Sequence, residues 1–429
     1  MPLFDSLRRM LSSEGKRTAP AAKLPACRGA RTIDYLGKTG EFSIEARYLL
    51  DLILLDALDV QASDIHLDPA EDHMLVRFRI DGMLHDVVKL PAHLKGPLAN
   101  RVKVMADLKI YEHRVPQEGK ARADESMGGF EMRVSLSPMV AGEKVSIRLF
   151  RPGEQRFSVQ TLGFDEHTLH QWVDLISQPH GLILLTGPVG SGKTTTLYST
   201  LTHLVNTQGQ RLNITTVEDP VEALLPRVNQ ATVNVAQGFT YPIALRSILR
   251  HDPQVIMIGE IRDEETANIA IRAGLSGHLV LSTVHSGNAA GAFARMANLN
   301  VDPQLLASAT LGVMNLRLVR QNCTQCAIPY EPGAMHLARL EGLDLDRAFF
   351  RKGSGCQHCG FTGFRGRLPV TELLVTNPEI GQLVATNAPS TQIHDLAEKH
   401  GMRSLAVNAV LRAFDGETTL EEISGFLIA

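Results

Sequence analysis

The sequence predicts an α/β protein of several domains, with a mostly parallel sheet in the second half of the chain. Three observations support this fold class. Short apolar runs alternate with helical patterns after residue 163, a glycine-rich loop joins one of these runs to a helix, and an alternating, strand-rich pattern comes before them. With 429 residues the chain is too long for one ordinary core, so two or three domains are expected.

The composition is that of an ordinary folded protein. Apolar residues make up 44% and charged residues 21%, and the formal net charge is −3. Near-neutral charge and 5% aromatic residues argue against nucleic acid, since a strand-binding groove needs basic and stacking residues. No apolar run reaches the roughly 18 residues of a membrane span, and the N-terminus lacks the apolar core of a signal peptide. We expect a cytoplasmic protein, with at most peripheral membrane association.

Residues 1–40 are predicted to form a tail. A short apolar stripe beside Arg8 and Arg9 is followed by a stretch rich in Pro, Ala and Lys. Two interpretations stay open for the stripe: a frayed or loosely packed helix, or a helix that touches a partner or a membrane surface.

Residues 41–150 predict a small α+β domain, called the N-domain below. The helical pattern EARYLLDLILLDALDV leads into four alternating runs, ASDIHLDP, HMLVRFRIDGML, FEMRVSLSP and KVSIRLF. Residues 151–162, which include RPGEQRFS, predict a linker.

Residues 163–320 predict the sheet domain. The runs GLILLTG, LNITTVED, QVIMIGE and HLVLSTV are nearly continuous apolar strands between helical segments, a pattern typical of a parallel sheet covered on both faces. Residues 321–371 contain two cysteine pairs, and residues 372–429 predict a helical segment.

The loop GPVGSGKT, residues 187–194, matches the phosphate-binding pattern G-x-x-x-x-G-K-[ST] in full. Its glycines let successive backbone N–H groups point at phosphate oxygens, and the following helix adds its positive end. Lys193 can reach the β- and γ-phosphates, and the Thr194 hydroxyl can join a magnesium shell. The sequence therefore predicts ATP and Mg²⁺ as ligands. The expected contact residues are Gly187, Pro188, Val189, Gly190, Ser191, Gly192, Lys193, Thr194 and Thr195.

Acidic residues follow two other apolar runs. Glu260 ends QVIMIGE and could order the magnesium ion or the attacking water. Glu218, Asp219 and Glu222 follow the run that ends in TTV. Because the carboxyl ends of parallel strands share one crevice, these acids are expected to converge there.

Two histidines flank a further strand: His278 comes before HLVLSTV's apolar core and His285 after it. A structural hydrogen-bonding role and a phosphate-sensing role are both open for each of them.

Four of the five cysteines form two C-x-x-C pairs separated by 29 residues. This spacing is typical of one tetrahedral zinc site, and four thiolates leave no open position, so the zinc would be structural. Buried thiols without metal are the alternative. The predicted ligands are Cys323, Cys326, Cys356 and Cys359.

Four blocks together resemble the type II secretion and type IV pilus assembly ATPases. GPVGSGKTTTLYS is similar to that family's Walker A segment, VEDPVE to its aspartate box, DPQVIMIGEIRDEETA to its Walker B strand and GLSGHLVLSTVHS to its histidine box. The resemblance extends from about residue 41 onward. It implies a homohexamer in which ATP binds between a PAS-like N-domain and a RecA-like domain. Hydrolysis would power pilus assembly or type II secretion through an inner-membrane platform protein, at the cytoplasmic face of that membrane.

The resemblance also implies residue roles. Glu260 would activate water, and Glu218 and Asp219 would belong to the metal shell. Guanidinium groups beside the transferred phosphoryl group would neutralise its charge, although a surface ion pair is the alternative for each. The full catalytic set implied is Lys193, Glu218, Glu260, His285, Arg133, Arg148, Arg246 and Arg250, with Asp219 and His278 contacting the nucleotide.

The cysteine module favours assembly or secretion over pilus retraction, because retraction ATPases generally lack it. The short N-terminal region leaves the family's usual docking mode open. The machine that the ATPase drives also stays open, with a conjugative or DNA-uptake pilus among the alternatives. Two other functions are alternatives as well: a nucleic-acid-translocating motor, and a nucleotide-gated scaffold with little turnover.

Overall fold

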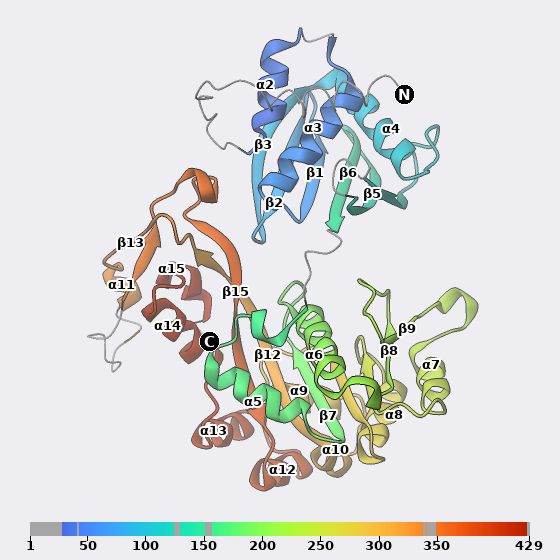
Figure 1. Cartoon of the computed structure of the whole chain (residues 1–429), viewed down its shortest axis with the longest axis vertical. Helices are drawn as coiled ribbons and strands as arrows, with labels where there is room; N and C mark the ends of the chain where they lie inside the picture. The colour runs from blue at the N-terminus through green and yellow to red at the C-terminus, as the bar shows by residue number, and fades with distance from the viewer. Residues whose placement is uncertain are drawn as a thin grey trace.

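The computed structural model describes residues 28–40, 43–123, 129–150, 157–337, 340 and 349–426. Two large sheets organise these residues: a six-stranded sheet in the N-domain and a seven-stranded sheet in the second half of the chain (Figure 1). The N-terminal stripe and residues 151–156 of the predicted linker lie outside the described residues.

The N-domain sheet is antiparallel throughout, in the order β3-β2-β1-β6-β5-β4. Alternate side chains such as Ile65 and Val145 are buried against two helices, which contribute Leu50 and Leu98 to the same core. The elements are α2 (Ala30–Lys38), α3 (Ala46–Asp59), β1 (Asp64–Pro69), β2 (His73–Ile80), β3 (Met83–Pro91), η3 (Ala92–Leu94), α4 (Lys95–Met105), β4 (Gln117–Arg122), β5 (Glu131–Met139) and β6 (Gly142–Phe150).

Helix α2 lies inside residues 1–40, for which the sequence predicts a tail. The buried carboxylate of Asp56 on α3 holds it: Oδ2 accepts hydrogen bonds from the Thr32 amide at 2.9 Å and the Thr32 hydroxyl at 2.7 Å. The folded part of the chain therefore begins before residue 41.

The run HMLVRFRIDGML forms a hairpin rather than one strand. Asp81 and Gly82 both have positive φ, 49° and 86°, which is the backbone of a two-residue hairpin turn between β2 and β3. Most of strand β3, strand β4 and helix α4 lie outside the runs predicted from the sequence.

The second sheet has the order β15-β12-β7-β11-β10-β8-β9, and its neighbouring strands are parallel except for β12 and β15. The phosphate-binding loop follows β7, a central strand. The strands are β7 (Gly181–Thr186), β8 (Ile214–Glu218), β9 (Asn229–Thr232), β10 (Val255–Ile258), β11 (Leu279–Thr283), β12 (Thr310–Asn322) and β15 (Phe364–Val375).

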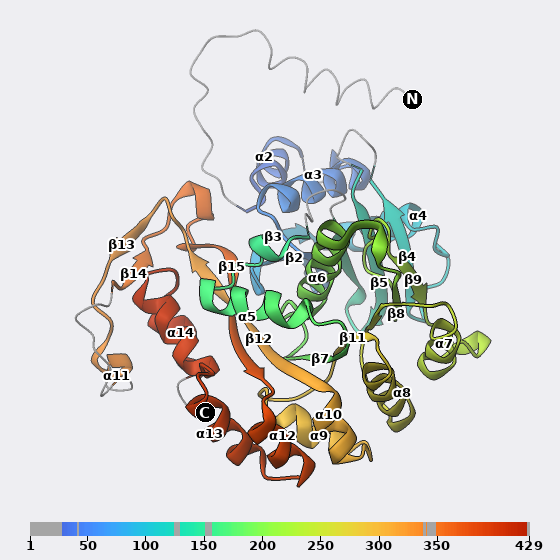
Figure 2. The same cartoon turned by 60° about the horizontal axis from the view of Figure 1, so that its bottom comes forward.

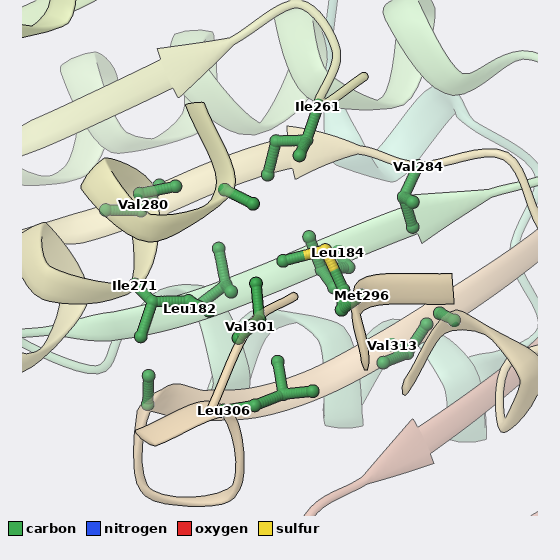
Figure 3. Packing of buried hydrophobic residues seen from close by; sticks show 14 of the residues in the cluster. Leu182, Leu184, Ile261, Ile271, Val280, Val284, Met296, Val301, Leu306 and Val313 are labelled. Atoms are coloured by element: carbon green, nitrogen blue, oxygen red, sulfur yellow. The ribbon is translucent and has the colours of Figure 1, made fainter. Parts of the chain in front are cut away.

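Helices cover both faces of this sheet, as the continuous apolar strands predict (Figure 2). Along β7, Leu182 and Leu184 face one layer and Ile183 and Leu185 the other; Figure 3 shows the packing around Leu184 and Met296. The first layer contains α7 (Tyr241–Ile248), α8 (Glu264–Leu275), α9 (Gly291–Ala297), α10 (Pro303–Ala309), α12 (Pro378–Ala385) and α13 (Ser390–Lys399), and the second contains α5 (Glu166–Ile176) and α6 (Lys193–Gln208).

Strands β12 and β15 extend past the sheet and carry the cysteine module and the last helices. Val319 and Val370 pack there against Val410 and Ile423. Strand β15 crosses the boundary predicted at residue 372, so the final helices begin only at α12. The elements of this region are β13 (Ala327–Pro329), α11 (Ala334–Leu337), β14 (Arg351–Gly353), η10 (Gln357–Cys359), α14 (Leu405–Phe414), α15 (Leu420–Ile423) and η11 (Ser424–Phe426). Short helical turns elsewhere are η5 (Val159–Thr161), η6 (Gly209–Arg211) and η7 (Val235–Gln237).

Within the described ranges, every helix falls short of the length and apolar character needed to cross a bilayer.

Asp165, the N-cap residue of α5, is expected to stabilise the folded protein. Its carboxylate caps α5 by accepting the Thr168 amide at 3.1 Å and the Thr168 hydroxyl at 2.6 Å. Burial opposes ionisation, but these bonds and the nearby Arg412 and Arg403 hold the pKa of Asp165 below its ordinary value. We expect Asp165→Ala to lower the free energy of unfolding by about 1 kcal/mol at neutral pH.

A lowered pKa in the folded state stabilises only while the carboxylate is ionised. The difference between Asp165→Ala and the wild type should therefore persist above about pH 4 and shrink as the pH falls through the folded-state pKa. Urea unfolding measures this difference in the free energy of unfolding. The signal is the fluorescence of Trp172, which is the only tryptophan and is fully buried. A difference that does not change with pH would contradict the charged cap.

Candidate nucleotide-binding site

The loop after β7 has the backbone that the glycine pattern predicts. Gly187, Gly190 and Gly192 have φ of 134°, 77° and 97°, a region that side chains disfavour. A Cβ at Gly187 would also collide with the carbonyl oxygen of Leu316 on β12. Helix α6 begins at Lys193, so the N-terminal amides of α6 face the loop.

Lys193 extends back over this loop. Its ammonium donates hydrogen bonds to the carbonyl oxygens of Gly187 at 2.8 Å and Pro188 at 2.9 Å. Burial, and to a lesser degree the nearby guanidinium of Arg317, lowers the pKa of Lys193. The buried Ser191 hydroxyl has no hydrogen-bond partner among the described residues. Clustered positive charge, inward-facing amides and a spare hydroxyl fit an anionic phosphate chain.

Glu260 follows β10 and faces the loop across one cavity of about 470 Å³. Its carboxylate forms an ion pair with Arg262, and Oε2 lies 3.7 Å from Nε2 of His285. The cavity is lined by Val189, Gly190, Gly192, Lys193, Thr194, Thr195, Glu218, Asp219, Glu222, Tyr241, Glu260, Arg262, His285, Leu318 and Arg367, among others. The strand-end acids, His285 and the loop thus meet at one edge of the sheet.

The Glu218 carboxylate is held by protein donors. Oε2 accepts the Tyr198 hydroxyl, and Oε1 accepts the Thr216 hydroxyl at 2.6 Å and the Gln230 amide at 3.1 Å. Burial and the contact with Glu218 raise the pKa of Tyr198 well above its usual range. These three donors already occupy most of the carboxylate's acceptor sites. The geometry therefore favours a positioning role for Glu218 over the metal-shell role that the family resemblance implies.

The four paired cysteines come together. Sγ–Sγ distances are 3.8 Å for Cys323–Cys356, Cys326–Cys359 and Cys356–Cys359, and the four sulfurs lie within 4.8 Å of one another. Four thiolates about 2.3 Å from a zinc ion define a tetrahedron with edges of about 3.8 Å. The Gly363 amide donates to the Cys359 sulfur at 3.3 Å, which stabilises a thiolate. The sulfur geometry fits a zinc ion.

Comparison with known proteins identifies the family. The family model described as Type II/IV secretion system protein matches residues 39–425. The chain belongs to this family. The match confirms the resemblance predicted from the four sequence blocks.

Curated relatives support the assignment. The type II secretion system protein HxcR of Pseudomonas aeruginosa is 42% identical over 87% of this chain and 76% of its own length. The type IV pilus assembly ATPase PilB of Thermus thermophilus is 39% identical over 88% of this chain, but the chain spans only 42% of that relative.

Solved structures show the same fold. The ATPase DotB of Legionella pneumophila has a TM-score of 0.65 at 17% identity and covers 89% of this chain and 96% of its own. The pilus retraction motor PilT with bound ADP has a TM-score of 0.59 at 24% identity and covers 88% and 96%. These likenesses confirm the predicted fold class.

The predicted N-domain arginines of this secretion-family chain lie in different places. Nη1 of Arg133 on β5 is 3.6 Å from the carboxylate of Glu222, at the cavity. Arg148 on β6 donates instead to Asp64 at 2.9 Å, within the N-domain. Of the two, Arg133 is thus the guanidinium that pairs with a residue lining the cavity.

Arg246 and Arg250 lie at the surface, on α7 and just after it. Arg246 pairs with Glu265 on α8, and Arg250 is exposed. Neither lines the cavity within the chain.

His278 lies at the wrong end of its strand for a phosphate contact. Its carbonyl oxygen accepts the Gly181 amide at 3.0 Å, beside the start of β7, while the phosphate-binding loop follows the end of β7. Its ring contacts the Ala273 carbonyl oxygen at 3.0 Å and the Ser276 hydroxyl at 3.2 Å. The structure corrects the predicted nucleotide contact: His278 has the structural role that was the alternative.

Several further residues line the cavity that were not predicted from the sequence. Arg262 lies two residues after Glu260, and the hydrogen bond that its guanidinium donates to that carboxylate raises the pKa of Arg262. A basic residue so close in the sequence to the strand-end acid indicates a neighbour in the same site. Leu318 and Arg367 reach the cavity from β12 and β15, more than 120 residues beyond the loop. No local sequence pattern predicts that Leu318 and Arg367 line the cavity.

Proposed function

We propose that this chain binds and hydrolyses ATP, and that hydrolysis powers pilus assembly or type II secretion through an inner-membrane platform protein. The observation that carries the proposal is the convergence of Lys193, at the start of α6, and Glu260, after β10, on one cavity. The family membership supports ATP hydrolysis as the activity.

The residues around the loop suit each part of ATP. The amides of the loop and Lys193 would hold the phosphates. A second cavity of about 400 Å³, lined by Phe157, Leu162, Thr195, Ser199 and Arg367, adjoins the loop and offers apolar and polar contacts for the base and ribose.

Glu260 is the proposed base for the attacking water, and Arg262 and His285 beside it fix its carboxylate. Thr194 and Asp219 would hold Mg²⁺, which neutralises charge on the phosphates when bound. Glu218 would act through Tyr198, by shaping the wall of the cavity.

The family resemblance implies a ring of subunits, and the predicted arginines are assigned places in it. Arg133 would respond to the nucleotide from the N-domain of the same chain. Arg148, Arg246 and Arg250 lie away from their own cavity, and we assign them to contacts with a neighbouring subunit of a homohexamer. The ring would work at the cytoplasmic face of the inner membrane and reach the membrane through its partners.

Zinc in the cysteine module would be structural, and the module supports an assembly or secretion motor rather than a retraction motor. Nucleic acid is not an expected partner, given the net charge of −3.

Complementation tests the cellular role. In the source organism, deletion of the gene should abolish surface pili or the export of a secreted protein, and the wild-type gene should restore them. A Lys193→Ala variant at equal abundance should give no restoration, because the phosphates lose their cation. Lys38→Ala is the control, since Lys38 is an exposed surface residue paired with Asp34. Full restoration by Lys193→Ala would refute a nucleotide-driven role.

A further inference from the structure

The segment after His285, residues 286–289, is held by side chains from β12 and β15. Asn315 and Arg317 on β12 both donate to the Gly287 carbonyl oxygen, at 3.3 and 3.0 Å. Glu372 on β15 accepts the Ala289 amide at 2.7 Å. Asn315 and Glu372 are directly opposite one another in the antiparallel pair. We call residues 286–289, which Asn315, Arg317 and Glu372 hold, the histidine loop.

The guanidinium of Arg317 also lies close to Gly187, at the start of the phosphate-binding loop. Its Nη1 donates to Asn315 Oδ1 at 2.9 Å and to the Leu316 carbonyl oxygen at 3.1 Å. A Cβ at Gly187 would lie 3.2 Å from that Nη1. One guanidinium therefore holds the histidine loop and lies close to the beginning of the phosphate-binding loop.

A second connection links the same two loops. The Thr186 hydroxyl, at the end of β7, donates to the Ser286 carbonyl oxygen at 2.9 Å and accepts the Ser286 amide at 2.8 Å. Movement of the histidine loop would thus displace the start of the phosphate-binding loop.

Glu372 connects the histidine loop to the C-terminal helices. The carboxylate is buried, 2% exposed, and its second oxygen accepts the amide of Leu405, the first residue of α14, at 3.2 Å. Burying a carboxylate is costly, and an apolar side chain would pack there without that cost. What the charged group supplies is a fixed position for two backbone amides.

We propose that Arg317 and Glu372 are positioning residues for ATP hydrolysis, which hold the histidine loop so that His285 stays beside Glu260. The inference rests on the proposed ATPase function. Neither side chain is assigned a contact with the reacting atoms, so loss of either should impair the hydrolysis step more than nucleotide binding.

Steady-state kinetics of Arg317→Ala test the first positioning residue. We expect kcat for ATP hydrolysis to fall by about 10- to 100-fold, with KM within about threefold of the wild type, because small displacements of catalytic groups have effects of this size. Free guanidinium, well below concentrations that unfold the protein, should partly restore kcat. Arg320→Ala is the matched control: Arg320 is on the same strand, but its ion pair is with Glu422 on α15.

Three results would overturn the role of Arg317: a kcat within about twofold of the wild type, an equal loss in Arg320→Ala, or no restoration by guanidinium. Wild-type protein without any turnover would instead refute the proposed function, so the two failures are distinguishable. Thermal unfolding followed by Trp172 fluorescence checks that each variant is folded.

Amide hydrogen exchange tests Glu372 without reference to activity. In Glu372→Ala, the amides of Ala289 and Leu405 lose their acceptor, so exchange in peptides covering 286–291 and the start of α14 should accelerate by about tenfold or more. Glu422→Ala is the control and should leave both peptides unchanged. Unchanged exchange at residues 286–291 in Glu372→Ala would show that Glu372 does not hold the histidine loop.

Discussion

Replacing Glu260 by glutamine is expected to lower kcat for ATP hydrolysis by about 10²- to 10⁴-fold, the contribution of a well-placed general base. Glutamine has nearly the same volume as glutamate and keeps the cavity filled, but its amide cannot take a proton from water. Lys193 and the loop amides are unchanged, so the variant should retain nucleotide. Phosphate release and binding of a fluorescent ATP analogue, measured on the same preparation, separate the two effects.

The matched control for Glu260→Gln is Glu264→Gln. Glu264 lies four residues along, in the first turn of α8, where it is exposed and accepts a hydrogen bond from Asn300. Turnover should stay close to that of the wild type. An unimpaired rate in Glu260→Gln would remove Glu260 from the role of base and leave Asp219 as the next acid in the cavity.

Replacing Cys356 by serine is expected to abolish stoichiometric zinc binding. The four sulfurs already have the spacing of a zinc tetrahedron, and a serine hydroxyl is a poor substitute for a thiolate. Free energy of metal binding of about 10 kcal/mol or more is typical of structural zinc, so its loss should unfold the module between β12 and β15. Metal analysis by mass spectrometry and limited proteolysis of residues 323–363 measure these effects.

Cys27→Ser is the control for the zinc experiment. Cys27 is the fifth cysteine and lies outside the described residues. That variant should keep one zinc per chain. Equal zinc content in Cys356→Ser and the wild type would refute the tetrahedral site.

Local patterns were sufficient for the central features of the site. The glycines at 187, 190 and 192 reflect positive φ and close backbone approach, which few other residues tolerate. The carboxyl ends of parallel strands share one edge of a sheet, and this rule predicts that Glu260 lies beside the loop. Applied strictly, the same rule excludes His278, which precedes its strand and therefore lies at the opposite edge of the sheet.

Features that depend on pairing between distant segments were beyond sequence reasoning. Strand β15 pairs with β12 across the cysteine module, and this pairing brings Arg367 to the cavity and Glu372 beneath the histidine loop. Partly buried polar residues such as Arg317 give no periodic signal, because their partners include backbone atoms of another loop. The hairpin at Asp81 and Gly82 is different: its Asp-Gly pair is a recognised turn signal, and it interrupts the single strand predicted there.

Release of inorganic phosphate from ATP by the purified chain with Mg²⁺, measured across protein concentrations that span its oligomeric forms, is the most direct test. The structure predicts that the wild type retains ATP and releases phosphate, and that Lys193→Ala gives only the background rate. Absence of both ATP binding and phosphate release in every oligomeric form would contradict the assignment of the Lys193–Glu260 cavity as the hydrolysis site.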